Sequence, residues 1–190
     1  MLIERALLYA NKVVAGDEIT TWEVKKQCEI FLHDYYHEDE TYYFDTDEVL
    51  LVEDLLSFMN FATGINCIGT SILEGLYGFQ CFFIVNIFGF RYKDKPKKFK
   101  HQDVTLFIPR KNAKTFILSV TLLILMLTEN DYSEFYSICI DRDLAGVVKK
   151  CMMQIIDVSP IITKRFKKSV TLSGKITCLL THSFYQARTS

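Results

Sequence analysis

The chain has 190 residues, of which 49% are hydrophobic and 24% are charged. This composition is typical of a folded protein and excludes an intrinsically disordered chain. The longest apolar run, residues 116–127, is too short to span a bilayer, and the N-terminus lacks the pattern of a signal peptide. We therefore expect no membrane insertion, and one good-sized core or a core with a small appendage.

Charge is distributed unevenly along the chain. Residues 1–78 contain 15 acidic and 4 basic residues, whereas residues 79–190 contain 8 acidic and 18 basic residues. We predict two domains on this basis, an acidic helical leader or lid at 1–78 and a basic domain at 79–190. A basic domain suits nucleotide or nucleic acid, and an acidic leader suits either an intramolecular lid or a basic protein surface. Charge alone leaves these alternatives open.

Cysteine and histidine spacing does not predict a metal site. The six cysteines are Cys28, Cys67, Cys81, Cys139, Cys151 and Cys178. They form no C-x-x-C pair and have no histidine at close spacing, so a zinc site is not expected. Several lie in apolar runs, and we interpret these as buried thiols in a reducing cytoplasm. His33 and His37 are four residues apart, but the H-E-x-x-H order is absent. We interpret them as exposed residues at a helix end.

Apolar residues recur at helical spacing in the first ninety residues. Helices are expected at residues 3–14, 22–32, 46–61 and 79–88. The first should end at Gly16, a natural C-cap, and the third should begin at Asp45 or Thr46. This predicts an all-helical leader.

The second part of the chain alternates strands and helices. Strands are expected at residues 104–108 and 135–140, helices at 116–127 and 144–158, and a hairpin or two edge strands at 170–173 and 176–180. Strand, loop, helix, strand, helix, strand is the pattern of an α/β domain. The fold class we predict is therefore α/β, preceded by the helical leader.

One loop between a predicted strand and a predicted helix has the residues of a phosphate-binding loop. It reads Ile108-Pro109-Arg110-Lys111-Asn112-Ala113-Lys114-Thr115. Such a loop needs backbone N–H groups at a helix N-terminus, a lysine for the phosphates and a hydroxyl for Mg²⁺, which Lys114 and Thr115 would provide. The match to G-x-x-x-x-G-K-S/T is imperfect, because Ile108 and Ala113 replace the glycines. From these eight residues alone, an ordinary basic surface turn is the favoured interpretation.

The surrounding segments change that interpretation. They are Glu4-Arg5-Ala6 with Tyr9-Ala10, Gln80 before Ile87-Phe88-Gly89-Phe90, the loop at 108–115, and Tyr136 through Asp141-Arg142-Asp143-Leu144-Ala145 before Ser159-Pro160. In this order they resemble the N-terminal part of the large subunit of tailed-phage terminases. The resemblance covers nearly the whole chain, and the Pro-Arg-Lys-Asn form of the loop is fairly specific to that family.

The resemblance implies a P-loop NTPase core of the additional-strand type and a motor that uses ATP and Mg²⁺. In that family the motor packages double-stranded phage DNA into a capsid in the host bacterial cytoplasm. A portal protein and a small terminase subunit are the implied partners, and a separate C-terminal nuclease domain cuts the DNA. A homo-oligomer is implied only for the full-length protein.

Carried over by position, the resemblance implies roles for individual residues. Gln80 matches the glutamine that reads adenine, since an amide offers both a donor and an acceptor. Arg110 matches an arginine of the variant loop, Lys114 the phosphate-binding lysine, and Thr115 the residue that binds Mg²⁺ together with the nucleotide. The remaining predicted contacts are Pro109, Lys111, Asn112 and Ala113. The methyl group of Ala113, in place of glycine, would crowd the approach to the phosphates.

Hydrolysis of ATP also needs a Walker-B aspartate and a carboxylate that orients water. No Asp-Glu pair follows an apolar strand after Thr115, and residues 158–190 contain no acidic residue. Asp141, after the strand at 135–140, is the local candidate, but Arg142 follows it. We therefore expect residues 79–190 to form a partial ATPase domain, truncated before Walker B and lacking the nuclease domain. Such a chain would bind ATP without hydrolysing it alone.

Two other functions stay open. The first is a catalytically inactive interaction module, or a degenerate prophage remnant, whose acidic leader docks a packaging partner. The second is a nucleic-acid-binding protein without ATPase ancestry. It depends on the basic segment 91–101, which reads either as a solvated turn or as a contact to a phosphate backbone.

Overall fold

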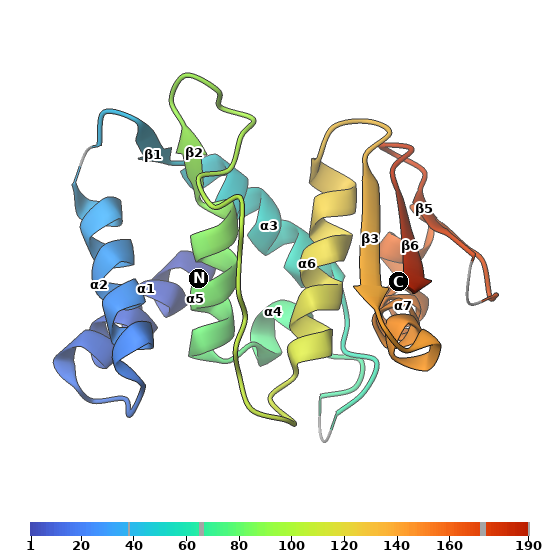
Figure 1. Cartoon of the computed structure of the whole chain (residues 1–190), viewed down its shortest axis with the longest axis horizontal. Helices are drawn as coiled ribbons and strands as arrows, with labels where there is room; N and C mark the ends of the chain where they lie inside the picture. The colour runs from blue at the N-terminus through green and yellow to red at the C-terminus, as the bar shows by residue number, and fades with distance from the viewer. Residues whose placement is uncertain (38, 65–66, 172–173, 190) are drawn as a thin grey trace. The chain divides into compact units, whose positions relative to one another are not determined.

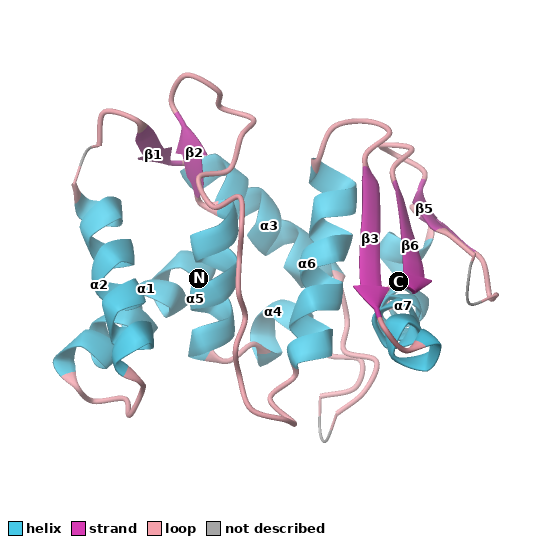
Figure 2. Ribbon diagram, viewed as in Figure 1, coloured by secondary structure: helices cyan, strands magenta, loops and turns pink. Residues whose placement is uncertain are grey.

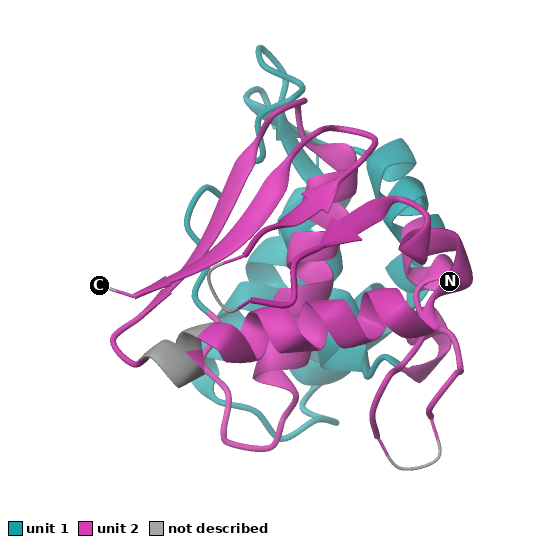
Figure 3. Cartoon of the chain, turned by 90° about the vertical axis from the view of Figure 1, so that its right-hand side faces the viewer, with its two compact units in different colours: residues 1–54, 76–105 teal, residues 55–75, 106–190 magenta. Residues whose placement is uncertain are grey.

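The computed structural model describes residues 1–37, 39–64, 67–171 and 174–189. Helices and strands are mixed along the chain (Figures 1 and 2). The chain forms two compact units: unit 1 contains residues 1–54 and 76–105, and unit 2 contains residues 55–75 and 106–190 (Figure 3). The division predicted at residue 78 groups the chain differently, because residues 79–105 belong with the acidic helices.

Three helices form the body of unit 1. They are α1 (Leu2–Ala15), α2 (Trp22–Tyr36) and α5 (Gly78–Phe88), and α1 packs against both of the others. Gly16 ends α1 with a φ of 90°, and its N–H donates to the carbonyls of Lys12 and Val13. This positive φ is the reason for glycine here, as the C-cap prediction stated. The predicted helices at 3–14, 22–32 and 79–88 are confirmed.

Unit 1 also contains a small antiparallel sheet. Strand β1 (Tyr42–Phe44) pairs with β2 (Phe90–Tyr92), with Tyr43 opposite Arg91. The N-terminal region predicted to be all-helical thus contains the short strand β1 as well, which the sequence did not predict. Beneath the sheet, Phe31 of α2 makes edge-to-face contacts with Phe82 and Phe90, at centroid distances of 5.2 and 5.9 Å. An aromatic cluster around Phe31 therefore forms part of this core.

The basic segment after β2 is a hairpin tied to unit 1 at both ends. A bridge joins Arg91 to Phe99, and the guanidinium carbon of Arg91 lies 3.6 Å from the Phe99 ring centroid. Arg91 is 6% exposed. Its Nη2 lies 2.9 Å from Oε1 of Glu48 and forms an ion pair with it, although the angles between these two groups are not those of a hydrogen bond. Lys100 forms an ion pair with Asp34. Two cations of the predicted solvated turn are therefore neutralised inside the unit.

The boundary between the units falls within α3 (Thr46–Phe58). The helix begins where predicted, with Oδ1 of Asp45 accepting the N–H of Glu48 at 3.0 Å. In unit 2, α4 (Ile72–Gly75) follows, and the backbone N–H of Asn60 donates to Oγ of Ser159 at 2.8 Å. These contacts attach residues 55–75 to the rest of unit 2.

The helices of unit 2 bury mainly aliphatic side chains. They are α6 (Lys114–Thr128), α7 (Arg142–Val158) and α8 (Pro160–Thr163), and α6 packs against α7. Leu123 and Ile124 of α6 and Ile156 of α7 have no exposed surface. The predicted helices at 116–127 and 144–158 are confirmed.

A four-stranded sheet completes unit 2, in the order β3-β6-β5-β4. Its strands are β3 (Glu134–Cys139), β4 (Phe166–Lys168), β5 (Ile176–Cys178) and β6 (Phe184–Thr189). Strand β3 runs parallel to β6, and the other pairs are antiparallel. Tyr185 and Ile176 on one face are fully buried, and α7 packs against β3 and β6.

Two strand predictions for the second part of the chain are wrong. The hairpin exists, but its first strand is at 166–168 and not at 170–173, of which residues 172–173 lie outside the described residues. Residues 104–108 form no strand and pair with no other described segment. Phe107 there is 97% exposed. A β-prone sequence needs a neighbouring strand for its backbone N–H and C=O groups, and residues 104–108 have none among the described residues.

Candidate functional site

The predicted phosphate loop lies directly before helix α6. Pro109 to Lys114 are all exposed, and α6 begins at Lys114. Lys111 and Ala113 have positive φ angles of 67° and 59°, in the left-handed region. Glycine adopts the left-handed conformation at a lower energy than alanine does. Ala113 therefore has the backbone conformation suited to the glycine of the motif, at a higher conformational energy.

The start of α6 offers N–H groups to an anion. The first N–H groups of a helix have no acceptor within the helix, and the helix dipole makes this end positive. The N-cap residue, Ala113, has no side-chain acceptor, and the first turn contains no acidic residue. The amide of Asn112 donates to the carbonyls of Pro109 and Arg110, at 3.5 and 3.3 Å, and braces the turn. An anion is therefore the ligand that this end can hold.

Lys114 and Thr115 occupy different environments. The ammonium of Lys114 donates to the carbonyl of Ile108 at 2.8 Å, so the side chain closes the base of the loop. Thr115 is half-buried, and its carbonyl accepts the hydroxyl of Ser119 at 2.7 Å. The Ser119 hydroxyl also lies 3.3 Å from the carbonyl of Val148, which links the first turns of α6 to α7. The ammonium has three N–H donors, so it keeps donors for a phosphate while it contacts Ile108.

Gln80 lies in unit 1, whereas the loop lies in unit 2. It is in the first turn of α5, is 3% exposed, and its Oε1 accepts the backbone N–H of Tyr77 at 2.9 Å. The side chain thus satisfies an N–H at the start of this helix. Its predicted role in reading adenine stays a prediction.

Asp141 follows β3 at the start of α7. Its Oδ1 accepts the N–H of Leu144 at 2.9 Å, the geometry of a helix N-cap. A capping role explains an aspartate here without a metal, and its predicted contact with Mg²⁺ stays a prediction. Within the described residues, no three His, Cys, Asp or Glu side chains come together as metal ligands.

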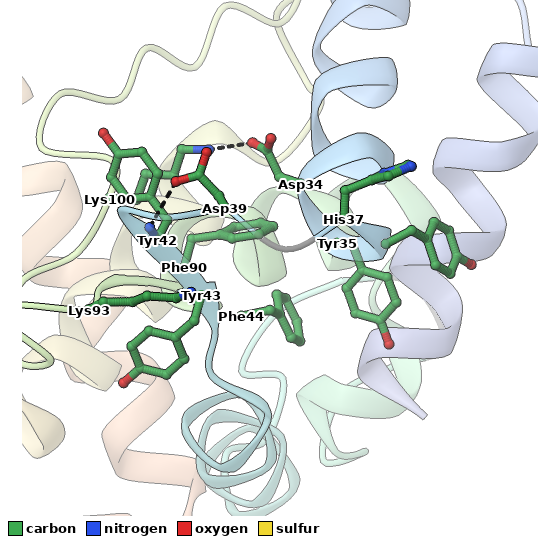
Figure 4. Close-up of a pocket in the computed structure, with 11 residues that line it drawn as sticks. Asp34, Tyr35, His37, Asp39, Tyr42, Tyr43, Phe44, Phe90, Lys93 and Lys100 are labelled. Carbon is green, nitrogen blue, oxygen red and sulfur yellow. Dashed lines mark hydrogen bonds and ion pairs between the residues drawn. The ribbon is translucent and has the colours of Figure 1, made fainter.

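Unit 1 contains a pocket that the sequence did not predict. Its volume is about 320 Å³, and it lies between the end of α2 and the β1–β2 sheet (Figure 4). It is lined by Asp34, Tyr35, Tyr36, His37, Asp39, Tyr42, Tyr43, Phe44, Phe90, Lys93 and Lys100. The density of tyrosines between residues 35 and 43 was the available signal, but pocket formation also needs β2.

A cation already lies among the aromatic residues of this pocket. The Lys100 ammonium is 4.7 Å from the Tyr42 ring centroid and 5.2 Å from that of Phe90, and it extends to Asp34 (Figure 4). Asp39 accepts the N–H groups of Thr41 and Tyr42, and these bonds hold the pKa of its carboxyl below the usual range. Aromatic faces and carboxylates together favour positively charged groups.

Comparison with known proteins gives one informative likeness. No protein-family model matches the sequence, and no curated protein matches it. Among solved structures, the chain is similar to the large terminase of bacteriophage HK97, with a TM-score of 0.55 and 20% sequence identity. The match covers 73% of this chain and 26% of the terminase chain. The fold is therefore one that a phage large terminase contains, as the sequence resemblance indicated.

The described helices do not include one that is long and apolar enough to cross a membrane.

The rings of His33 and His37, the predicted helix-end residues, stack at a centroid distance of 4.6 Å, and the His33 side chain is 70% exposed.

Proposed function

We propose that this chain is part of a large terminase and that the loop at 108–115 binds ATP with Mg²⁺. The observation that carries the proposal is the loop itself: an exposed turn with two left-handed residues, followed by Lys114 and Thr115 at the start of α6. The fold likeness to a phage large terminase supports it. The terminase would package double-stranded phage DNA, with a portal protein and a small terminase subunit as partners.

Each loop residue has a distinct task in this proposal. Backbone N–H groups of residues 111–115 would surround the phosphates, and the Lys114 ammonium would donate to a phosphate oxygen. The Thr115 hydroxyl would bind the Mg²⁺ that accompanies the nucleotide. Arg110 is exposed beside this end of the helix and adds positive charge. We propose binding without hydrolysis by this chain alone, since no Asp-Glu pair follows an apolar strand after Thr115.

Calorimetric titration of the whole chain with Mg·ATP tests the proposal. Lys114→Ala should weaken ATP binding by roughly ten-fold or more, the effect of losing one charged hydrogen bond. Lys150→Ala is the matched control, because it removes the same charge from an exposed site on α7. Thr115→Val should reduce the dependence of binding on Mg²⁺. Undiminished ATP affinity in the Lys114 variant would overturn the proposal.

A second candidate is an interaction module that docks a basic partner. It is favoured by the unit 1 pocket, where aromatic rings and Asp34 already hold the ammonium of Lys100. In this function the pocket takes a basic side chain of a packaging partner, and the loop at 108–115 has no active role. Titration with an oligo-arginine peptide tests it. Asp39→Asn should weaken peptide binding, and an unchanged affinity would rule out the pocket as the docking site.

A further inference from the structure

The outward face of the sheet in unit 2 combines aromatic rings with cations. Register places Glu134 beside Phe184, Tyr136 beside Gln186, and Ile138 beside Arg188. The outer sheet face consists of Glu134, Tyr136, Ile138, Lys167, Lys175, Thr177, Phe184, Gln186 and Arg188. The intervening residue Tyr185 is fully buried on the other face. Successive side chains along a strand point to opposite faces of the sheet. Residues next to the buried ones therefore lie on the accessible face.

The two rings of the outer sheet face lie side by side. The centroids of Tyr136 and Phe184 are 5.9 Å apart, with the rings nearly perpendicular. The guanidinium carbon of Arg188 lies 4.1 Å from the Tyr136 centroid, and the Lys175 ammonium lies 3.3 Å from the Phe184 centroid. Each ring thus has a cation as its neighbour. Ile138 beside them is 71% exposed, so the surface is open to a ligand.

Charge on the outer sheet face is predominantly positive. Lys167, Lys175 and Arg188 are all exposed, and Glu134 is the one acidic residue in the set. Lys167 lies opposite Thr177, which lies opposite Phe184, so the cations extend across the sheet from β4 to β6. The hydroxyl of Tyr136 donates to Glu134, which occupies one oxygen of that carboxylate. A polyanion therefore complements this face better than a basic or neutral partner does.

We propose that the outer sheet face binds single-stranded nucleic acid. Bases would stack on Tyr136 and Phe184, and phosphates would contact Lys175, Arg188 and Lys167, the combination that single-strand-binding sheets use. The cations beside the rings do not block this arrangement, because exposed side chains change rotamer within nanoseconds. They would move from the ring to the adjacent phosphate. In a duplex the bases are already stacked and paired, so the face should prefer single strands.

This proposal goes beyond the nucleotide loop and uses none of its residues. Fluorescence anisotropy with labelled oligothymidylate, oligouridylate and a duplex is the test. Both single strands should bind the whole chain more tightly than the duplex does. The affinity should fall with salt with a logarithmic slope of about −2, as expected for about three phosphate contacts on a single strand. A difference between the two strands would assign a preference for DNA or RNA.

Two sets of variants separate phosphate contact from stacking. The triple variant Lys167→Gln, Lys175→Gln, Arg188→Gln should abolish most of the salt dependence. Its matched control, Lys12→Gln, Lys25→Gln, Lys26→Gln, removes the same charge from exposed positions of α1 and α2 and should bind normally. Tyr136→Leu should weaken binding by roughly ten-fold and keep the salt slope, because it removes one stacking platform and no charge. Circular dichroism confirms that each variant is folded.

Three results would overturn the proposal: no binding of either single strand at low salt, equal binding by the triple variant and its control, or tighter binding of the duplex. The outcome is independent of the ATP proposal. The triple variant should bind Mg·ATP like the unmodified chain, and Lys114→Ala should bind oligothymidylate like the unmodified chain. Loss of ATP binding alone therefore removes one proposal and leaves the other.

Discussion

Unit 1 and unit 2 differ in where their aromatic and charged side chains lie. Unit 1 packs aromatic rings around Phe31 and encloses a pocket that holds its own lysine. Unit 2 buries mainly aliphatic side chains in its helices, and cationic side chains lie exposed on the loop at 108–115 and on the outer sheet face. The ion pairs of Arg91 and Lys100 thus distinguish the first unit, and the cations of the loop and the sheet face distinguish the second.

The comparison also changes the meaning of the charge distribution. Divided at residue 78, the chain looks strongly polarised, but unit 1 has 16 acidic and 10 basic residues and unit 2 has 7 acidic and 12 basic residues. The difference arises because the basic hairpin after β2 belongs to the acidic unit. Charge along a sequence therefore overstates charge separation in space when distant segments pair.

The largest effect we predict tests whether the hairpin is anchored in unit 1. Glu48→Gln leaves the guanidinium of Arg91, which is 6% exposed, without its countercharge. We expect a loss of about 2–4 kcal/mol in the free energy of unfolding, measured with urea. Asp94→Asn is the control, because its ion pair with Lys95 is exposed and should contribute under about 1 kcal/mol. Equal effects of the two substitutions would show that the hairpin is not anchored by this pair.

A smaller effect is expected at the loop of unit 2. Ala113→Gly removes the penalty for a left-handed alanine with φ of 59°. We expect a gain of about 1 kcal/mol in unfolding free energy, together with tighter binding of Mg·ATP. Thermal unfolding and calorimetry measure the two effects. The neighbouring Asn112→Gly serves as a control for flexibility, and the same gain there would show that loop flexibility, and not the left-handed conformation, sets the effect.

The smallest effect concerns pH and unit 1. Burial lowers the pKa of His101, and the positive charge of Lys100 lowers it further, while Asp34 opposes the shift. As the pH falls below about 6.5, His101 is protonated in the unfolded chain before it is protonated in the folded one. The unfolding free energy should therefore decrease with falling pH, until the pH is below the folded-state pKa of His101 as well. His101→Gln should show less of this decrease in urea titrations. An identical pH dependence in both proteins would contradict the assignment.

Local patterns predicted the helices well. The helices at 3–14 and 144–158 have apolar residues at regular spacing, and Gly16 and Asp45 have the conformation or hydrogen bond that their caps require. These features depend on neighbouring residues only. Gly16 in particular needs a positive φ, which few other residues tolerate.

Long-range pairing explains the strands that sequence reasoning missed. Strand β1 needs β2, and β6 needs β3, so neither is defined by its own residues. Residues 104–108 show the converse, because a strongly β-prone segment stays unpaired without a neighbour. The same distinction between local and long-range features applies to the candidate sites. The loop before α6 could be recognised from consecutive residues, whereas the pocket in unit 1 and the outer sheet face form only when distant segments come together.

The parallel pairing of β3 with β6 has a consequence for how the protein folds. Glu134 and Phe184 are adjacent in the sheet but about 50 positions apart in the chain. Closing a loop of this length costs roughly 3.5 kcal/mol of chain entropy before the first bond of the ladder forms. Because β6 lies between β3 and β5, the sheet is incomplete until that closure occurs. We therefore expect the helices to form early and the sheet to set the rate of folding.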